Sequence, residues 1–192
     1  MEKLIQILKS RSMNGYFVKT KEQAKNKALE LIPRNSIVGF GGSATLQEIG
    51  LLDELRQRKD IKLYDRISAK AKDMPKLNID SLSADIFLSG TNSITEKGQL
   101  VNVDGVGNRV AAIIFGPKKV IIIAGKNKVT KDIDSALDRI KKVALVKNME
   151  RMKKFGRKDW NEENMWGQVS IIERQRDPNR MHVIIVDEEL GF

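Results

Sequence analysis

The segment KVIIIA, residues 119–124, constrains the fold of this chain more than any other feature of its sequence. A strand with one face in water alternates apolar and polar residues, so an unbroken apolar run of strand length indicates a strand covered on both faces. Such strands are typical of parallel sheets whose connecting helices pack on either side. This segment therefore predicts an α/β protein rather than an all-β or all-helical one.

Strand patterns and helical patterns alternate along the rest of the chain, as expected for a parallel sheet. Strands are predicted at residues 16–18, 36–40, 61–64, 84–89 and 119–124. Helices are predicted at residues 2–12, from Thr20 to near Pro33, from the end of a glycine loop to about Arg58, at 108–115, and from Asp132 onward, with helical turns at 68–83 interrupted near Pro75.

The tail differs, because two apolar segments at 169–172 and 183–186 bracket the polar stretch ERQRDPNR. This pattern predicts a C-terminal β-hairpin with a long loop. We therefore expect one α/β domain over residues 1–192, a three-layer sandwich with a mostly parallel central sheet. Residues 160–192 would form a hairpin extension of that domain.

Charge and composition exclude several classes of function. The net charge of +10 favours acidic partners, and residues 141–158 hold eight basic residues against Glu150 alone. No nucleic-acid recognition motif accompanies them, so nucleic acid is not an expected partner. The chain has no cysteine and a single histidine, His182, predicted to be a packed strand residue; no metal site is expected. No apolar run approaches the roughly 20 residues that cross a bilayer. The N-terminal segment MEKLIQILKSRS is amphipathic and carries Glu2, so neither a secretory signal nor a transit peptide is expected and a cytoplasmic location is predicted.

In parallel α/β sheets, ligands bind beyond the carboxyl ends of the strands. One strand-end loop lies in SIVGFGGSATLQEIG, residues 36–50. Its spelling departs from the nucleotide-binding glycine motifs, yet Gly41, Gly42, Ser43 and Thr45 can present N–H groups and hydroxyls to an anion. The alternative is a simple turn, with Thr45 capping the next helix and Glu48 returning the hydrogen bond. The sequence leaves both readings open.

A second group of polar residues follows in SGTNSITEKGQLVNVDGVGNR, residues 89–109. A hairpin turning at EKG would bring Glu96 and Asp104 beside Arg109, a set suited to proton transfer or carboxylate recognition. The alternative is turn chemistry, which explains the glycines and Asp104 but not Arg109 at the start of an apolar helix. Further candidate ligand-binding residues are Thr91, Asn92, Asn108 and, closing the site, Lys126.

The sequence resembles the LUD-domain family, named for lactate utilisation, and in particular its short single-domain members of the lactate utilisation protein C type. The matching segments are VGFGGSATLQEIG, the block from ADIFLSGTNS to AGKNKV, VKNMER and MHVIIVDEELGF. The resemblance implies a fold like that of sugar-phosphate isomerases and CoA-transferases. It also implies a role in organic-acid oxidation beside iron–sulfur partner proteins. Relatives often carry cysteines where this chain reads RKDWNEENMWGQVS, so no redox role is expected there; Trp160 and Trp166 are predicted to pack.

Three functions remain open at this point. The first is an accessory protein of lactate or organic-acid utilisation that binds a phosphate- or carboxylate-bearing small molecule at the glycine loop. The second is an enzyme of the sugar-phosphate isomerase or CoA-transferase type that uses Glu96 or Asp104. The third is an interaction subunit that docks an acidic protein through residues 141–158. No cofactor is assigned, and a homodimer is expected.

Overall fold

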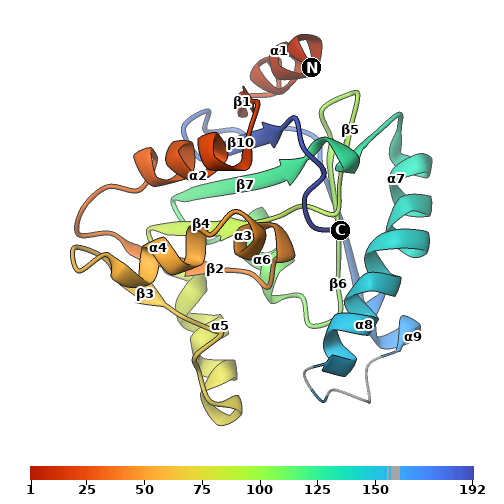
Figure 1. Cartoon of the computed structure of the whole chain (residues 1–192). Coiled ribbons are helices and arrows are strands. Elements are labelled where there is room, and N and C mark those ends of the chain that lie inside the picture. Colours follow the sequence, from red (N-terminus) through yellow and green to blue (C-terminus); the bar gives the residue numbers. More distant parts are fainter. Residues whose placement is uncertain (155, 157–160) are drawn as a thin grey trace.

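A six-stranded parallel sheet forms the centre of the molecule in a computed structural model, which describes residues 1–154, 156 and 161–192 (Figure 1). Every pair of neighbouring strands in this sheet is parallel. In spatial order the strands are β1 (Asn14–Val18), β10 (Met181–Val186), β7 (Lys119–Gly125), β4 (Ile86–Ser89), β2 (Ile37–Phe40) and β3 (Lys62–Tyr64). The predicted fold class is therefore confirmed.

Strand β7 is covered on both faces, as its sequence predicts. Ile121 and Ile123 pack into one apolar core with helices α2 (Lys21–Glu30), α3 (Ala44–Glu48) and α4 (Leu51–Gln57). Val120 and Ile122 pack into a second core on the opposite face, together with α1 (Glu2–Ser10) and α6 (Asn108–Ile114). The alternation of side chains along one apolar strand thus builds two cores at once.

A smaller second sheet lies beyond the second core and was not predicted. Its strands, in spatial order, are β8 (Val129–Thr130), β5 (Ser93–Thr95), β6 (Leu100–Asp104) and β9 (Gln168–Ile172). The predicted hairpin between β5 and β6 is confirmed, with Gly98 in the left-handed region at φ 78°. The other face of β6 packs on α7 (Ile133–Arg139) and the π-helical turn Ile140–Leu145, which forms a third core. The chain then continues through α8 (Val146–Lys154) and α9 (Glu162–Met165).

The C-terminal hairpin pairing is a correction, although both of its strands form near the predicted places. Strand β9 pairs with β6 in the small sheet, whereas β10 inserts between β1 and β7 in the large sheet. The burial of the two strands gives the reason. All six residues of β10 are buried, as the interior of a parallel sheet requires, while β9 keeps exposed residues on one face at a sheet edge.

Two helical segments also differ from expectation. The helix predicted to run to Arg58 is two helices, because Gly50 adopts φ 69° between α3 and α4. Pro75 does not interrupt a helix; it lies in the first turn of α5 (Met74–Leu82), where its missing N–H leaves no hydrogen bond unmade. Helix α5 is preceded by a 3₁₀ turn at Ala71–Asp73.

The strand order determines where a ligand can bind. From β2 the chain moves outward to β3 and then returns to β4 on the other side of β2. The loops that follow β2 and β4 therefore diverge at a topological switch point, the place where ligands bind in open α/β sheets. Among the described residues, no helix is long and apolar enough to cross a membrane.

Candidate functional site

A cavity of about 560 Å³ opens at this switch point. Its walls come from the loops after β2, β4 and β7, from the end of β6, and from α8 and the segment before α5. Arg66, Arg109, Lys128 and Arg151 line it, and Asp104 is the carboxylate among the residues that line it. The cavity is therefore strongly cationic.

The glycine loop forms one wall of the cavity, through Gly41, Gly42 and Ser43. The Gly41 N–H continues the sheet by donating to Leu88 O at 2.9 Å. A Cβ built on Gly41 would lie 3.1 Å from the Arg109 side chain, so this glycine permits close packing of Arg109. Gly42, in contrast, is exposed to the cavity.

Ser43, not Thr45, caps the following helix. The Ser43 hydroxyl accepts a hydrogen bond from Leu46 N at 3.3 Å, as expected of an N-cap residue. Thr45 lies inside α3, fully buried, where its hydroxyl receives a hydrogen bond from Lys128 Nζ at 2.9 Å. Glu48 accepts a hydrogen bond from Gly191 N instead of returning one to Thr45. The predicted capping box is thus wrong, because the helix begins two residues earlier.

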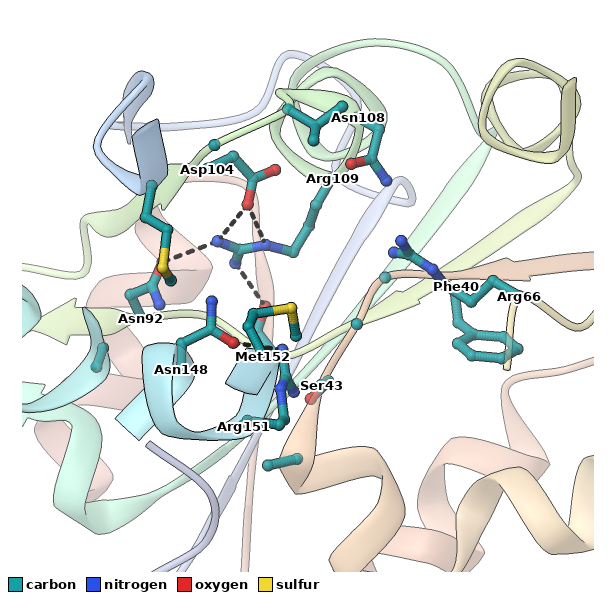
Figure 2. Close-up of a pocket in the computed structure, with 18 of the residues that line it drawn as sticks. Phe40, Ser43, Arg66, Asn92, Asp104, Asn108, Arg109, Asn148, Arg151 and Met152 are labelled. Atoms are coloured by element: carbon teal, nitrogen blue, oxygen red, sulfur yellow. Dashed lines mark hydrogen bonds and ion pairs between the residues drawn. The ribbon is translucent and has the colours of Figure 1, made fainter. Parts of the chain in front are cut away.

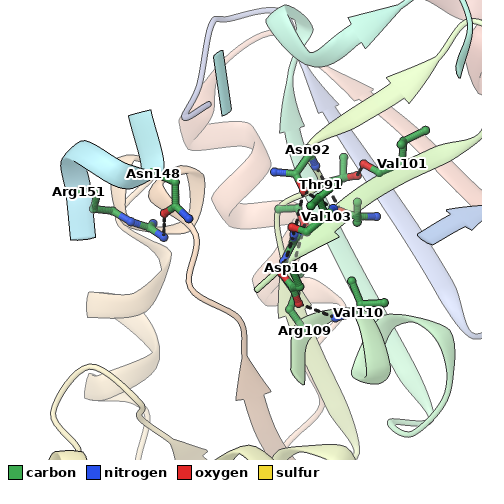
Figure 3. Close-up of polar contacts among 12 residues, drawn as sticks. Thr91, Asn92, Val101, Val103, Asp104, Arg109, Val110, Asn148 and Arg151 are labelled. Carbon is green, nitrogen blue, oxygen red and sulfur yellow. Dashed lines mark hydrogen bonds and ion pairs between the residues drawn. The ribbon is translucent and has the colours of Figure 1, made fainter. Parts of the chain in front are cut away.

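Each guanidinium nitrogen of Arg109 donates a hydrogen bond to a neighbouring residue (Figure 3). Its Nε donates to Asp104 Oδ1 at 2.9 Å, and its Nη atoms donate to Asn102 Oδ1, Asn92 Oδ1 and Val103 O, each at 2.8 Å. Asp104 also accepts from Val110 N at the start of α6. The sequence suggests carboxylate recognition by the group around Arg109, whereas the geometry supports a structural ion pair of Arg109 with Asp104.

Arg151 and Arg66 approach the glycine loop from another side of the cavity (Figure 2). A Cβ built on Gly42 would lie 3.7 Å from Arg151 Nη2 and 3.8 Å from Arg66 Nη1. Arg151 donates to Asn148 Oδ1 at 2.6 Å, and its guanidinium lies 5.3 Å from the centre of the Phe192 ring. Its Nε is buried without a hydrogen-bond partner in the described structure. Burial, together with the charges of Arg66 and Arg109, lowers the pKa of Arg151 to about 10.

Lys128 occupies the place that the sequence interpretation gives to Lys126. Lys126 is exposed, ion-pairs with Asp187 at 3.4 Å and does not line the cavity. Lys128 lines the cavity and is only 2% exposed. Burial, and then the nearby charges of Arg139 and Arg109, lower its pKa to about 7. Lys126 is the first lysine after β7 and so fits a strand-end position in the sequence, whereas the 3₁₀ turn Lys126–Lys128 carries Lys128 inward.

The remaining predicted residues divide into two groups. Thr91, Asn92, Asn108 and Asp104 line the cavity with the glycine loop. Thr91 and Asn92 also brace the small sheet, since Thr91 donates to Ser93 O and Asn92 Oδ1 accepts from Val103 N. Glu96 does not join them. It is exposed at the β5–β6 turn, whereas Asp104 lies at the far end of β6, about 13 Å along the strand from Leu100.

Among the described basic residues of the stretch at 141–158, Arg151 is the one that lines the cavity. Lys141, Lys142, Lys147, Lys153 and Lys154 are exposed, and Arg157 and Lys158 lie outside the described residues. Trp166 packs against the third core, as predicted, and Trp160 lies outside the described residues. His182 is buried in β10, where Tyr16 and Asn179 O hold its ring nitrogens, so it is the predicted packed strand residue. No group of metal-ligating side chains occurs in the described part of the chain.

Comparison with known proteins supports the fold and the family. The structure is similar to a DUF162 family protein from Deinococcus radiodurans, with a TM-score of 0.59 and 13% identity over 96% of this chain and 94% of that one. Weaker similarity extends to ribose 5-phosphate isomerases from Plasmodium falciparum (TM-score 0.38, 20% identity, 58% of this chain and 52% of that one) and Neisseria gonorrhoeae (TM-score 0.38, 15% identity, 69% and 65%). No curated protein matches by sequence. The LUD domain model matches residues 1–186, and the chain therefore belongs to the LUD-domain family.

Proposed function

We propose that this protein binds a small anion, bearing a phosphate or carboxylate, in the cavity at the switch point, and that it does so as an accessory protein of lactate or related organic-acid utilisation. Membership of the LUD-domain family supports the metabolic context. The observation that supports anion binding is the environment of Arg151. Its guanidinium is drawn into the cavity, keeps a buried Nε–H without a partner, and has no carboxylate within 4.0 Å in the described part of the chain.

Arg151 is half-buried, and a buried N–H of a cation that has neither a hydrogen-bond partner nor a counter-ion is unfavourable unless something compensates it. Asp104 is the carboxylate among the described residues that line the cavity, and it forms no ion pair with Arg151. Asp104, moreover, is already bonded to Arg109 and Val110 N. An anion beside Gly42 would lie near both Arg151 and Arg66, and its charge would offset the burial and the repulsion from Arg66 that lower the Arg151 pKa.

The enzyme alternative has less support from the geometry. It rests on Glu96 or Asp104 as base or nucleophile, and Glu96 does not line the cavity. Asp104 does line it, but its oxygens are engaged by Arg109 and by a backbone N–H. The interaction-subunit alternative, the iron–sulfur partner proteins and the homodimer stay predictions from the sequence.

The experiment that tests the proposal is a thermal-shift titration with inorganic phosphate, lactate, pyruvate, sugar phosphates and CoA thioesters. A ligand present at about a hundred times its dissociation constant adds about 2.7 kcal/mol to the free energy of unfolding. The decisive variant is Ser43→Asp. Aspartate is as good an N-cap as serine, so α3 persists, while its carboxylate places a negative charge in the anion site.

The matched control is Thr20→Asp, which likewise places an aspartate at an N-cap, that of α2. We expect the shift to disappear in Ser43→Asp and to persist in Thr20→Asp. A shift that survives in Ser43→Asp would move the site elsewhere. A panel in which every anion is silent would refute the proposed function.

A further inference from the structure

Lys128 is a buried amine for which anion binding alone does not account. Its Nζ donates to Thr45 Oγ1 at 2.9 Å, and no carboxylate of the described residues lies within 4.0 Å of it. The charged groups around it are Arg139, Arg109 and Arg151, with Glu48 as the acidic residue that acts against them. An amine in such surroundings favours its neutral form, because both burial and neighbouring cations oppose its charge.

This amine lies at the wall of the cavity. Gly90 follows β4 and lines the cavity, and its lack of a side chain lets Ser43 and Lys128 lie close to its backbone. A Cβ built on Gly90 would lie 2.9 Å from Ser43 Oγ, which is too close for a carbon atom, and 3.7 Å from Lys128 Nζ. The Ser43 hydroxyl and the Lys128 amine therefore border the same part of the cavity wall, while Gly42 faces Arg151 and Arg66.

We propose that Lys128 is a nucleophile that forms an imine with a small carbonyl compound whose anionic group is held at Gly42 by Arg151 and Arg66. This inference rests on the proposed anion site. The amine lone pair attacks the carbonyl carbon and forms the C–N bond, while the carbonyl π electrons move to oxygen. The oxygen leaves as water with the two hydrogens of the amine, and the product is a C=N bond. The step needs no oxidant, reductant or further reactant.

The protonation state makes the reaction feasible at neutral pH. With its pKa lowered to about 7, roughly half of the Lys128 amines are neutral at pH 7, against about one in 2,500 for an ordinary lysine. The many exposed lysines of the chain should therefore react far more slowly than Lys128. This difference makes the site detectable against their background.

The experiment is reductive trapping with cyanoborohydride at pH 7, followed by peptide mapping by mass spectrometry. The probes are pyruvate, which carries a carboxylate, dihydroxyacetone phosphate, which carries a phosphate, and acetone, which carries neither. We expect an adduct on Lys128 with one or both anionic probes and little with acetone. The more reactive probe identifies the anionic group that the site prefers. Inorganic phosphate should suppress the adduct by occupying the anion site.

Two variants and one control sharpen the result. Lys128→Met should abolish the adduct, and Gly90→Ala should reduce it by crowding the Ser43 hydroxyl and the wall beside the amine while the amine itself remains. Lys126→Met, which removes an exposed lysine of the same turn, should leave it unchanged. No adduct, an adduct spread over exposed lysines, or an unchanged yield in Lys128→Met would overturn the proposal. If trapping fails while phosphate still stabilises the wild type, the imine is wrong and the anion site stands; if both fail, the proposed function fails too.

Discussion

Two arginines line the same cavity and differ in almost every other respect. Arg109 is 9% exposed and makes hydrogen bonds to Asp104, Asn102, Asn92 and Val103 O. Arg151 is bonded to Asn148 and keeps an Nε–H that nothing in the described structure accepts. Figure 3 shows the two guanidinium groups in two separate clusters. Every guanidinium nitrogen of Arg109 donates a hydrogen bond within the protein, whereas the Nε–H of Arg151 has no acceptor among the described residues.

The difference separates structure from function within one site. A cation whose donors are all used inside the protein stabilises the fold and has little left to offer a ligand. A buried cation with a donor unused lowers stability in the empty protein and recovers that loss when an anion arrives. Removing the two arginines should therefore have opposite consequences for stability and for binding.

The largest expected effect is the loss of stability in Arg109→Met. The substitution leaves Asp104 and two amide oxygens near-buried and without their shared donor, which costs about 3–5 kcal/mol of the free energy of unfolding. Urea denaturation followed by circular dichroism measures it. A loss below about 1 kcal/mol would contradict the view that Arg109 is structural.

Arg151→Met should lose affinity while keeping stability. Charged hydrogen bonds contribute about 1.5–3 kcal/mol, so the dissociation constant of the best anion should rise by about ten- to a hundredfold. Calorimetric titration measures the affinity, and urea denaturation should show a free energy of unfolding no lower than that of the wild type. If Arg151→Met destabilised the protein as much as Arg109→Met does, the view that Arg109 stabilises the fold while Arg151 binds the anion would be contradicted.

Lys128, which lines the same cavity as Arg151, should make the free energy of unfolding depend on pH. Its folded pKa of about 7 lies below the unfolded value, so the unfolded chain binds more protons between about pH 7 and 10. This lysine therefore lowers stability most below pH 7, and its penalty fades as pH rises. Lys128→Met should raise the free energy of unfolding at pH 6 by on the order of 1–2 kcal/mol, with a gain that shrinks by pH 9. Urea titrations at both pH values test it; a gain that is equal at the two pH values would show that Lys128 stays charged throughout.

The smallest expected effect belongs to Glu96→Gln. Glu96 is exposed at the β5–β6 turn and does not line the cavity, so neither anion affinity nor stability should change measurably. Titration with the best anion found in the thermal-shift panel checks this. A large loss of affinity, or of any turnover, would revive the enzyme alternative and place the working site at the hairpin.

Local sequence patterns predicted the parts of the fold that depend on local physics. The apolar run of β7 indicated a strand buried on both faces, and Thr20 and Asp132 cap their helices as their positions suggested. Such local patterns do not reveal which strands pair when they lie far apart in the sequence. Nothing near β10 in the sequence indicates that it pairs with β1 and β7 rather than with β9. The small sheet was missed for the same reason, since its strands are joined across distant segments.

The candidate site was predicted in outline, since loops that follow strands can be found from the sequence. Gly41, Gly42, Ser43, Thr91 and Asn92 were recognised in this way, and all line the cavity. Lys128 was missed because a single 3₁₀ turn decides which lysine points inward. Arg151 was missed because it lies within a basic stretch whose other described members are mostly exposed. Its place on the side of α8 that borders the cavity distinguishes it from those exposed members.

The position of β10 has a consequence for how the chain acquires its structure. Within the part of the chain that the structure describes, β1 is bonded in the large sheet only to β10, although about 160 residues separate the two. Strand β1 therefore gains no neighbouring strand until residues 181–186 reach it. Closing the long loop between β1 and β10 is slow. Until then the apolar edges of β1 and β7 stay open to other chains. We expect folding intermediates of this protein to be the species most prone to aggregate, and a chain truncated before β10 to lack the means of closing its own sheet.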